Sequence, residues 1–234
     1  MAVRILVYGE DENDRDIIRE LIVAICPSAA GRVEKRRRPP MFVKGGSSTN
    51  LAHRAQKFAA AVRADESANG PVSCVFVHED ADGLPPEDEV RGRQMRDACA
   101  NEGLDVIPVV PAWEIEAWFF LFPAAVARGF PSWRRLPERP GARVDFIENA
   151  KERFRALTAP PGGKRRYVES DGRRIASCIR ELGLADSPVG EAAAFTRFRE
   201  DVAGCCTSGH GHASHGTRGP TGRGGRRRRQ GAKR

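Results

Sequence analysis

Short apolar runs alternate with longer amphipathic segments along the first half of the chain. The apolar runs are nearly continuous in Val, Ile, Leu and Phe, which is typical of strands buried in a parallel sheet, and predict strands at 3–8, 41–44, 72–78 and 104–110. Segments with apolar residues at helical spacing predict helices at about 11–26, 50–64 and 87–101. This alternation predicts an α/β fold with a mostly parallel, Rossmann-like sheet flanked by helices.

The second half of the chain has helical rather than strand patterning. We expect helices at 113–122, 144–157, 172–182 and 190–202. The predicted organisation is an α/β domain at 1–130 with a helical C-terminal extension at 131–203 packed on it. Residues 204–234 are rich in Gly, Arg and His and contain no large apolar residue, so we expect a disordered tail.

The net positive charge of the chain comes from its end. Residues 204–234 hold eight of the 39 Lys and Arg and none of the 31 Asp and Glu, so the remainder is neutral. No apolar run approaches the roughly 20 residues of a membrane helix, and the N-terminal run is too short for a signal peptide. We therefore expect a cytoplasmic protein without a membrane partner.

The cysteines fit the same compartment. Four are widely spaced in apolar segments, where we expect buried free thiols: Cys26, Cys74, Cys99 and Cys178. The pair Cys205-Cys206 lies before several histidines without a regular zinc spacing, so only adventitious metal binding is expected there.

Carboxylates follow three of the predicted strands. Asp80 and Asp82 come directly after the apolar run ending at His78, Glu10 follows the first strand, and Glu114 and Glu116 follow the strand at 104–110. The carboxyl ends of parallel strands meet at one edge of a sheet, where such folds place ligands. Oxygen ligands of this kind suit Mg²⁺ or Mn²⁺.

These motifs resemble those of TOPRIM-like proteins, in particular the small RloB-like and OLD-nuclease-related group. The resemblance covers about residues 3–200, and its short motifs are Tyr8-Gly9-Glu10-Asp11-Glu12, Asp80-Ala81-Asp82-Gly83 and Glu116-Ala117-Trp118. The chain departs from the family pattern at Tyr8, where the family usually has a glutamate. Strand alternation would let Glu10 face the same way as Tyr8 and substitute for that carboxylate.

The resemblance implies a metal-dependent nuclease subunit that works with a separate P-loop ATPase chain, in defence against phage. It implies catalytic roles for Glu10, Asp80 and Asp82, with Glu116 as a further ligand of Mg²⁺ or Mn²⁺. The supporting residues would be Gly9, Glu12, Gly83, Glu114 and Lys164. Weak nucleic-acid contacts are expected at Lys164, Arg165 and Arg166, which a solvated surface explains equally well.

Two other functions stay open. With Tyr8 in place of the family's carboxylate, the chain could be a non-catalytic adaptor that binds an ATPase. Asp80-Ala81-Asp82-Gly83 also loosely fits the opening motif of haloacid-dehalogenase-like phosphatases, in which the first Asp is the nucleophile. His78 lies inside a predicted strand and is expected to be a core histidine or one that supports a ligand, rather than a ligand itself.

Overall fold

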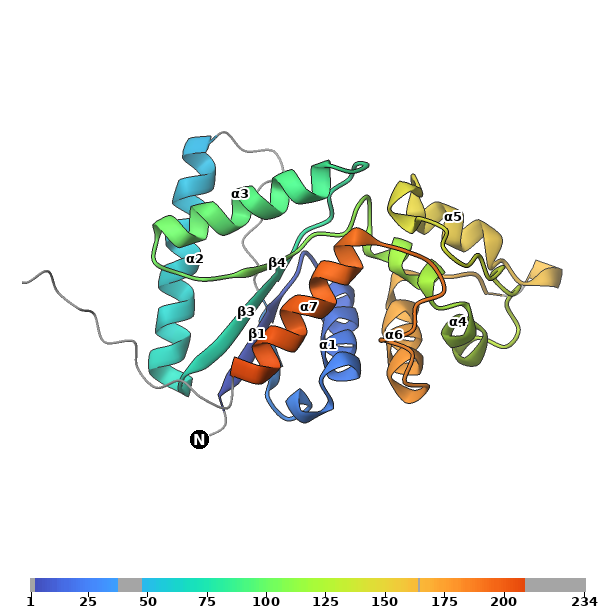
Figure 1. Ribbon diagram of the computed structural model, residues 1–234, viewed down its shortest axis with the longest axis horizontal. Coiled ribbons are helices and arrows are strands. Elements are labelled where there is room, and N and C mark those ends of the chain that lie inside the picture. The colour runs from blue at the N-terminus through green and yellow to red at the C-terminus, as the bar shows by residue number, and fades with distance from the viewer. Residues whose placement is uncertain (1–2, 38–47, 164, 209–234) are drawn as a thin grey trace, which may run out of the picture.

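The protein is built around a four-stranded parallel sheet. The computed structural model describes residues 3–37, 48–163 and 165–208. The strands are β1 (Arg4–Tyr8), β2 (Val33–Lys35), β3 (Val72–His78) and β4 (Ile107–Val109), in the order β2-β1-β3-β4. All pairs are parallel, so the four carboxyl ends lie at one edge. The predicted α/β class with a parallel sheet flanked by helices is confirmed (Figure 1).

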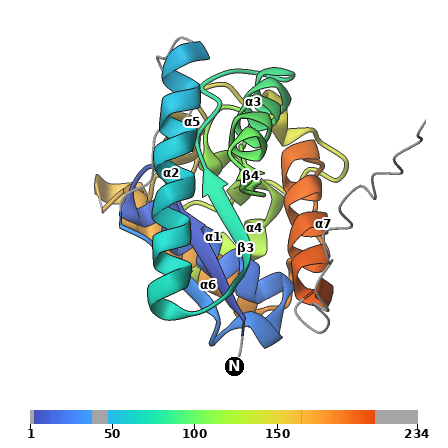
Figure 2. The same ribbon diagram turned by 90° about the vertical axis from the view of Figure 1, so that its left-hand side faces the viewer.

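Helices cover both faces of this sheet, because the apolar residues of its interior strands alternate between two clusters. Leu6, Tyr8, Val75 and Val77 point toward α2 (Ser48–Asn69) and α3 (Glu87–Asn101). Ile5, Val7 and Phe76 point toward α1 (Glu12–Ile25) and α7 (Ala193–Ser208). Figure 2 shows α2 and α7 on opposite sides of β3. The strands are therefore buried on both faces, as their unbroken apolar runs predict.

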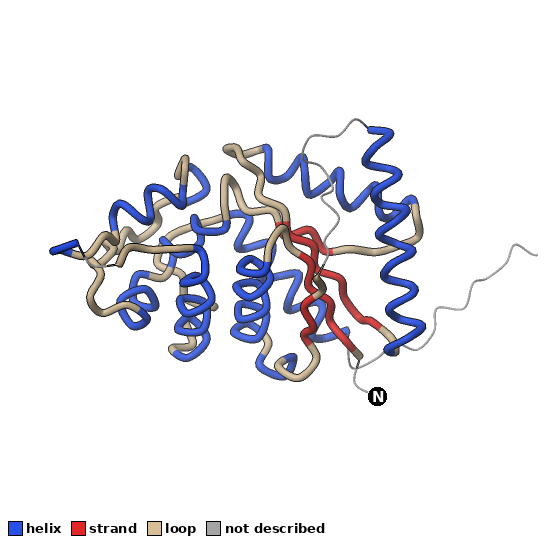
Figure 3. Tube along the Cα trace, turned by 180° about the vertical axis from the view of Figure 1, so that it is seen from behind, coloured by secondary structure: helices blue, strands red, loops and turns tan. Residues whose placement is uncertain are grey.

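A further layer of helices extends the molecule beyond α1. It contains α4 (Pro123–Gly129), α5 (Ala150–Leu157), α6 (Gly172–Glu181) and the short 3₁₀ helices η2 (Ile115–Leu121), η3 (Val144–Phe146), η4 (Pro161–Gly163) and η5 (Glu169–Asp171). A Cβ at Gly172 would lie 2.6 Å from Cδ1 of Ile17, so the glycine permits the close packing of α6 on α1. Figure 3 shows the strands displaced toward one end by this layer.

Several predicted elements differ from the observed ones. The strand expected at 41–44 lies outside the described residues, and the observed β2 is a short, partly buried edge strand that its polar sequence conceals. The helix expected at 113–122 is instead the shorter 3₁₀ helix η2. Trp113 precedes it in a turn, with a φ of 64° that an α-helix does not allow. The helix expected at 144–157 is divided into η3 and α5.

The C-terminal boundary and the cysteines also need correction. Helix α7 continues to Ser208, past the expected start of the tail at 204, and residues 209–234 lie outside the described part. Cys205 is buried and forms a disulfide with Cys74, while Cys206 forms one with Cys26. The expectation of free thiols at Cys26 and Cys74 is wrong because α7 brings its two cysteines to them.

Cys99 and Cys178 are buried free thiols, as expected. Within the ranges that the structure describes, no helix has the length and apolarity to cross a membrane.

Candidate active site

The acidic residues expected at the edge of the sheet meet in one pocket of about 310 Å³. Eight carboxylates line it: Glu10, Asp11, Asp14, Asp80, Asp82, Glu114, Glu116 and Glu169. The single basic residue in its lining is Lys151. The residues predicted from the ends of β1, β3 and β4 are therefore brought together.

Backbone pairing beyond the strand ends fixes the two acidic loops against each other. The amide of Ala81 donates to the carbonyl of Pro111 at 3.2 Å, and that of Asp82 donates to Trp113 at 2.9 Å. The amide of Trp113 returns a hydrogen bond to the carbonyl of Gly83 at 2.9 Å. Asp82 and Trp113 both have positive φ angles, 50° and 64°. These turns hold the carboxylates after β3 beside those after β4.

Asp80 lies at the centre of the pocket's polar contacts. Its Oδ1 accepts a hydrogen bond of 3.1 Å from the amide of Ile115 and lies 3.2 Å from Nε2 of His78. Nδ1 of the same imidazole lies 3.5 Å from Oδ2 of Asp14. Although burial alone would lower the pKa of His78, the charges of Asp14 and Asp80 raise it to about 9. At neutral pH a buried imidazolium therefore lies between two of the carboxylates.

Glu10 reaches the pocket from the turn after β1. Its Oε1 accepts a hydrogen bond of 3.1 Å from the amide of Asp80, which joins the first strand's acid to the third strand's motif. Tyr8 instead packs on the opposite side of the sheet, with its ring 4.7 Å from that of Phe58. The expected common direction of Tyr8 and Glu10 is wrong, because the chain has left the strand at Gly9.

Glu116 is the most deeply buried acid of the pocket, at 4% exposure. Burial and the nearby charge of Asp80 raise its pKa to about 8, despite a 2.9 Å hydrogen bond donated by the Tyr167 hydroxyl. Burial also raises the pKa of Asp14, to about 6. Burial, with a further contribution from neighbouring negative charges, thus favours the protonated forms of Glu116 and Asp14, and a bound cation would favour their charged forms.

Glu114 connects the pocket to the C-terminal layer. Its Oε2 accepts a hydrogen bond of 2.9 Å from the amide of Lys151, at the start of α5. Nζ of Lys151 lies 3.4 Å from Oε1 of Glu114 and 3.1 Å from Oε1 of Glu169. Although burial alone would lower the pKa of Lys151, these carboxylates raise it, so its ammonium stays charged.

Other predicted supporting residues have different places. Glu12 does not line the pocket, and its exposed carboxylate lies 3.7 Å from Nζ of Lys35. Gly9 accepts a hydrogen bond from Arg15 through its carbonyl, so its contribution is structural. Arg165 pairs with Asp171 at 2.8 Å, and Arg166 is exposed away from the acidic pocket's lining. Lys164 lies outside the described residues.

The sequence reasoning missed Asp11, Asp14, Lys151 and Glu169 and gave His78 only a supporting place. A signal existed for Asp14, because Asp11 and Asp14 have the three-residue spacing of a capping box. The amide of Asp14 donates to Asp11 at 2.9 Å, and the amide of Asp11 donates to Asp14 at 3.2 Å. The start of α1 therefore contributes two acids to the pocket.

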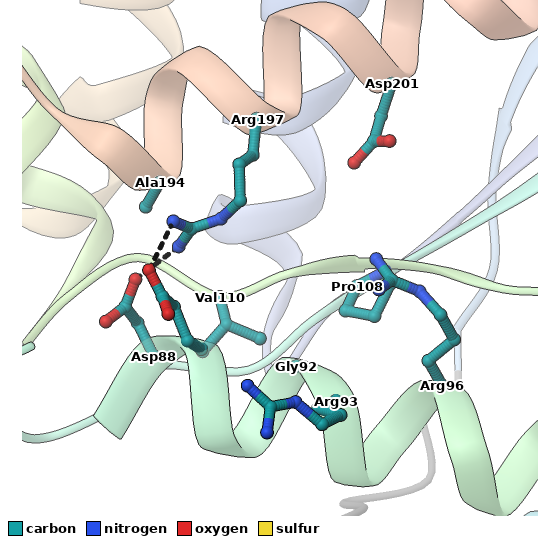
Figure 4. A pocket seen from close by; sticks show the side chains of 10 residues that line it. Asp88, Gly92, Arg93, Arg96, Pro108, Val110, Ala194, Arg197 and Asp201 are labelled. Carbon is teal, nitrogen blue, oxygen red and sulfur yellow. Dashed lines mark hydrogen bonds and ion pairs between the residues drawn. The ribbon is translucent and has the colours of Figure 1, made fainter. Parts of the chain in front are cut away.

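A different pocket of about 290 Å³ lies between α3 and α7 (Figure 4). Its lining contains three arginines, Arg93, Arg96 and Arg197, and three acids, Asp88, Glu89 and Asp201. Arg197 forms ion pairs with Asp88 and Glu89 across the two helices. With balanced charge and these internal pairs, this pocket is a polar seam between α3 and α7.

The donor set of the acidic pocket fits Mg²⁺ or Mn²⁺, since it supplies carboxylate oxygens from three strand ends. In the described part of the chain, however, no group of three or more His, Cys, Asp or Glu side chains is already arranged to hold a metal ion. Glu10, Asp80 and Glu116 each accept a hydrogen bond from the protein instead. Metal binding would therefore require these side chains to rotate toward a common point.

Fold and site together define an α/β protein with four parallel strands and an acidic pocket at their carboxyl edge. Comparison of the chain with protein-family models, with curated proteins and with solved structures finds no significant match.

Proposed function

We propose that the protein is a TOPRIM-like, Mg²⁺- or Mn²⁺-dependent phosphodiesterase that cleaves nucleic acid at the acidic pocket. The observation that carries the proposal is the convergence of eight carboxylates on one pocket of about 310 Å³. Structural ion pairs do not need such an excess of one charge. A pocket that binds metal cations, which in turn attract a phosphate, accounts for this excess of negative charge.

The residues in and around the acidic pocket would have different roles according to their position. Glu10, Asp80 and Glu116 would hold the metal, which when bound supplies charge stabilisation to the phosphodiester and lowers the pKa of water. Asp82, more exposed than Asp80, faces incoming substrate and completes the set. His78 positions Asp80 and Asp14 from below, as hydrogen-bonding groups behind metal ligands commonly do. Lys151 provides a cation for a non-bridging phosphate oxygen.

The position of Tyr8 bears on the adaptor alternative. That alternative rests on the loss of a carboxylate at Tyr8, yet the tyrosine side chain packs against Phe58 on the far face of the sheet. The pocket retains Glu10 from the same strand. This arrangement supports catalysis over a purely binding role.

Lys151 gives some support to a phosphatase as the second candidate. A haloacid-dehalogenase-like mechanism needs a lysine beside the nucleophilic aspartate, and Lys151 lines the same pocket as Asp80. Such an enzyme would hydrolyse phosphomonoesters through an aspartyl phosphate. Hydrolysis of a nucleoside monophosphate without cleavage of any oligonucleotide would favour this candidate over the phosphodiesterase.

The test combines Mn²⁺ titration calorimetry with cleavage of single- and double-stranded DNA and RNA. Replacing Asp80 and Asp82 together by Asn removes two negative charges while retaining side chains of the same size. We expect Mn²⁺ binding to be lost and cleavage to fall to the level without protein. Metal-dependent cleavage that survives in this variant would contradict the proposal.

The ATPase partner, the role in phage defence and phosphate contacts at Arg165 and Arg166 stay predictions from the sequence. Copurification of the chain with a P-loop ATPase would test the first of them.

A further inference from the structure

A second cavity of about 220 Å³ lies in the C-terminal layer, on the other side of α5 from the acidic pocket. Apolar side chains form much of its wall: Phe120, Val144, Phe146, Ile147 and Leu157. Phe146 and Leu157 are 46% and 41% exposed, so their side chains are accessible to a ligand. An exposed aromatic face beside an aliphatic wall is suited to stacking a planar ring.

The charged residues of this cavity are all positive. Its lining contains Arg139, Arg143 and Arg153 and no carboxylate. The guanidinium of Arg143 lies 4.4 Å above the ring of Phe146, and those of Arg139 and Arg153 make no hydrogen bond or ion pair within the described residues. The seam between α3 and α7 differs, because its Arg197 is paired with acids. We call this cavity the arginine pocket.

The loop that carries two of these arginines is fixed by backbone hydrogen bonds. The amide of Glu191 donates to the carbonyl of Ala142 at 2.9 Å, and the amide of Val144 donates to Glu191 at 2.9 Å. A Cβ at Gly190 would lie 2.6 Å from the Ala142 carbonyl oxygen, so only glycine allows this approach. The arginine pocket is therefore preformed, which reduces the entropic cost of binding.

The two pockets share elements. Helix α5 places Lys151 in the acidic pocket and Arg153 and Leu157 in the arginine pocket. The 3₁₀ helix η2 likewise places Glu116 in one and Phe120 in the other. Residues close together in sequence on α5 and on η2 therefore line both pockets, so a polynucleotide bound at one pocket passes the elements that form the other.

We propose that the arginine pocket binds one nucleotide of a single-stranded nucleic acid, with its base packed against Phe146 and the Arg143 guanidinium that covers one face of that ring, and its phosphate paired with Arg139 and Arg153. The proposal rests on the proposed function for its choice of a polynucleotide. It adds a base-binding subsite that presents a single strand to the acidic pocket. Duplex is excluded because its bases are already stacked on one another and cannot reach Phe146.

The test is fluorescence anisotropy of the full chain with a labelled oligothymidine in EDTA, so that binding is measured without metal or cleavage. Phe146→Ala should weaken binding on the order of tenfold, and Phe146→Trp should restore it. Arg153→Ala should weaken binding and reduce the salt dependence by about one counterion. Arg155→Ala is the matched control, since Arg155 lies on the same helix and does not line the arginine pocket.

Three results would overturn the proposal. They are unchanged binding in Phe146→Ala, equal affinity for an abasic strand, and equal affinity for duplex or for a mononucleotide. The basic residues 226–229 contribute equally in every variant and cancel in the comparison. Because the assay contains no metal, loss of the subsite can be separated from failure of the phosphodiesterase proposal. Asp80→Asn should bind oligothymidine in EDTA at least as tightly as the unmodified chain.

Discussion

The acidic pocket and the arginine pocket lie on either side of α5 and have opposite charge. One has eight carboxylates around a single lysine, and the other has three arginines and no acid. Glu116 in the acidic pocket is buried, whereas Phe146 in the arginine pocket is 46% exposed. In the two proposals above, the acidic pocket would bind the metal ion and the arginine pocket would bind the base and phosphate of a nucleotide.

The largest expected difference between the pockets is in their response to pH. A metal binds deprotonated carboxylates, and the pKa of Glu116 is raised to about 8 and that of Asp14 to about 6. We expect Mn²⁺ affinity to rise with pH up to about pH 8, by up to about tenfold per unit. Oligothymidine binding in EDTA should be flat over this range, because arginine stays charged. An Mn²⁺ affinity that does not change with pH would contradict the raised pKa values of Glu116 and Asp14.

The stability of the metal-free protein should change in the opposite direction. The folded pKa values of Asp14, His78 and Glu116 all lie above their ordinary values, so the folded state binds more protons than the unfolded one. The stabilisation is complete at acid pH below those ordinary values and is lost as pH rises. For Glu116 the loss occurs between 4.5 and about 8. The difference between the Tm measured in Mn²⁺ and the Tm measured in EDTA should therefore increase with pH.

A smaller effect is expected from Tyr167→Phe, which affects the acidic pocket alone. The Tyr167 hydroxyl donates to Oε1 of Glu116 at 2.9 Å and so favours the charged carboxylate. Its removal should raise the pKa of Glu116 further and weaken Mn²⁺ binding about tenfold at neutral pH. Calorimetry measures this change, and oligothymidine binding in EDTA should not move. If Mn²⁺ binding and oligothymidine binding both weaken, Tyr167 acts through the packing of the fold and not through its hydrogen bond to Glu116.

The smallest effect is expected from Glu12→Gln. Glu12 belongs to the acid-rich motif after β1, but its carboxylate is exposed beside Lys35 and does not line the acidic pocket. Mn²⁺ affinity should stay within about twofold of the original, since exposed ion pairs contribute little. The same titration measures it, and a larger loss would extend the acidic pocket onto the outer surface of α1.

The sequence predicted the strand ends better than the rest of the acidic pocket. β3 and α3 have the expected bounds, because an unbroken apolar run and a flanking proline pair are local signals. Glu10, Asp80, Asp82, Glu114 and Glu116 could be predicted because parallel strands deliver their ends to one edge. Lys151 and Glu169 could not, since they arrive from α5 and η5 through packing between residues distant in sequence.

The cysteines illustrate the same limit. Cys26 and Cys74 are 180 and 131 residues away from their disulfide partners, and no local pattern connects them. Cys205 and Cys206 stand at the start of a Gly-rich stretch, which conceals their place at the end of α7. Composition does not predict the end of α7, because its last turns are held by tertiary contacts, the disulfides of Cys205 and Cys206.

The position of α7 has a consequence for the order in which the protein can be made. The ring centroids of Phe198 in α7 and Phe76 in β3 lie 6.1 Å apart, and those of Phe195 in α7 and Trp118 lie 5.2 Å apart. The last described helix therefore completes the core beside β3. The ribosome releases α7 after every other described element, so the earlier residues are synthesised before this part of the core is available. Until then α1 covers this face of the sheet without α7, and the side chain of Phe76 lacks its contact with Phe198. A chain that stops before Ala193 would carry an exposed aromatic surface and depend on a chaperone.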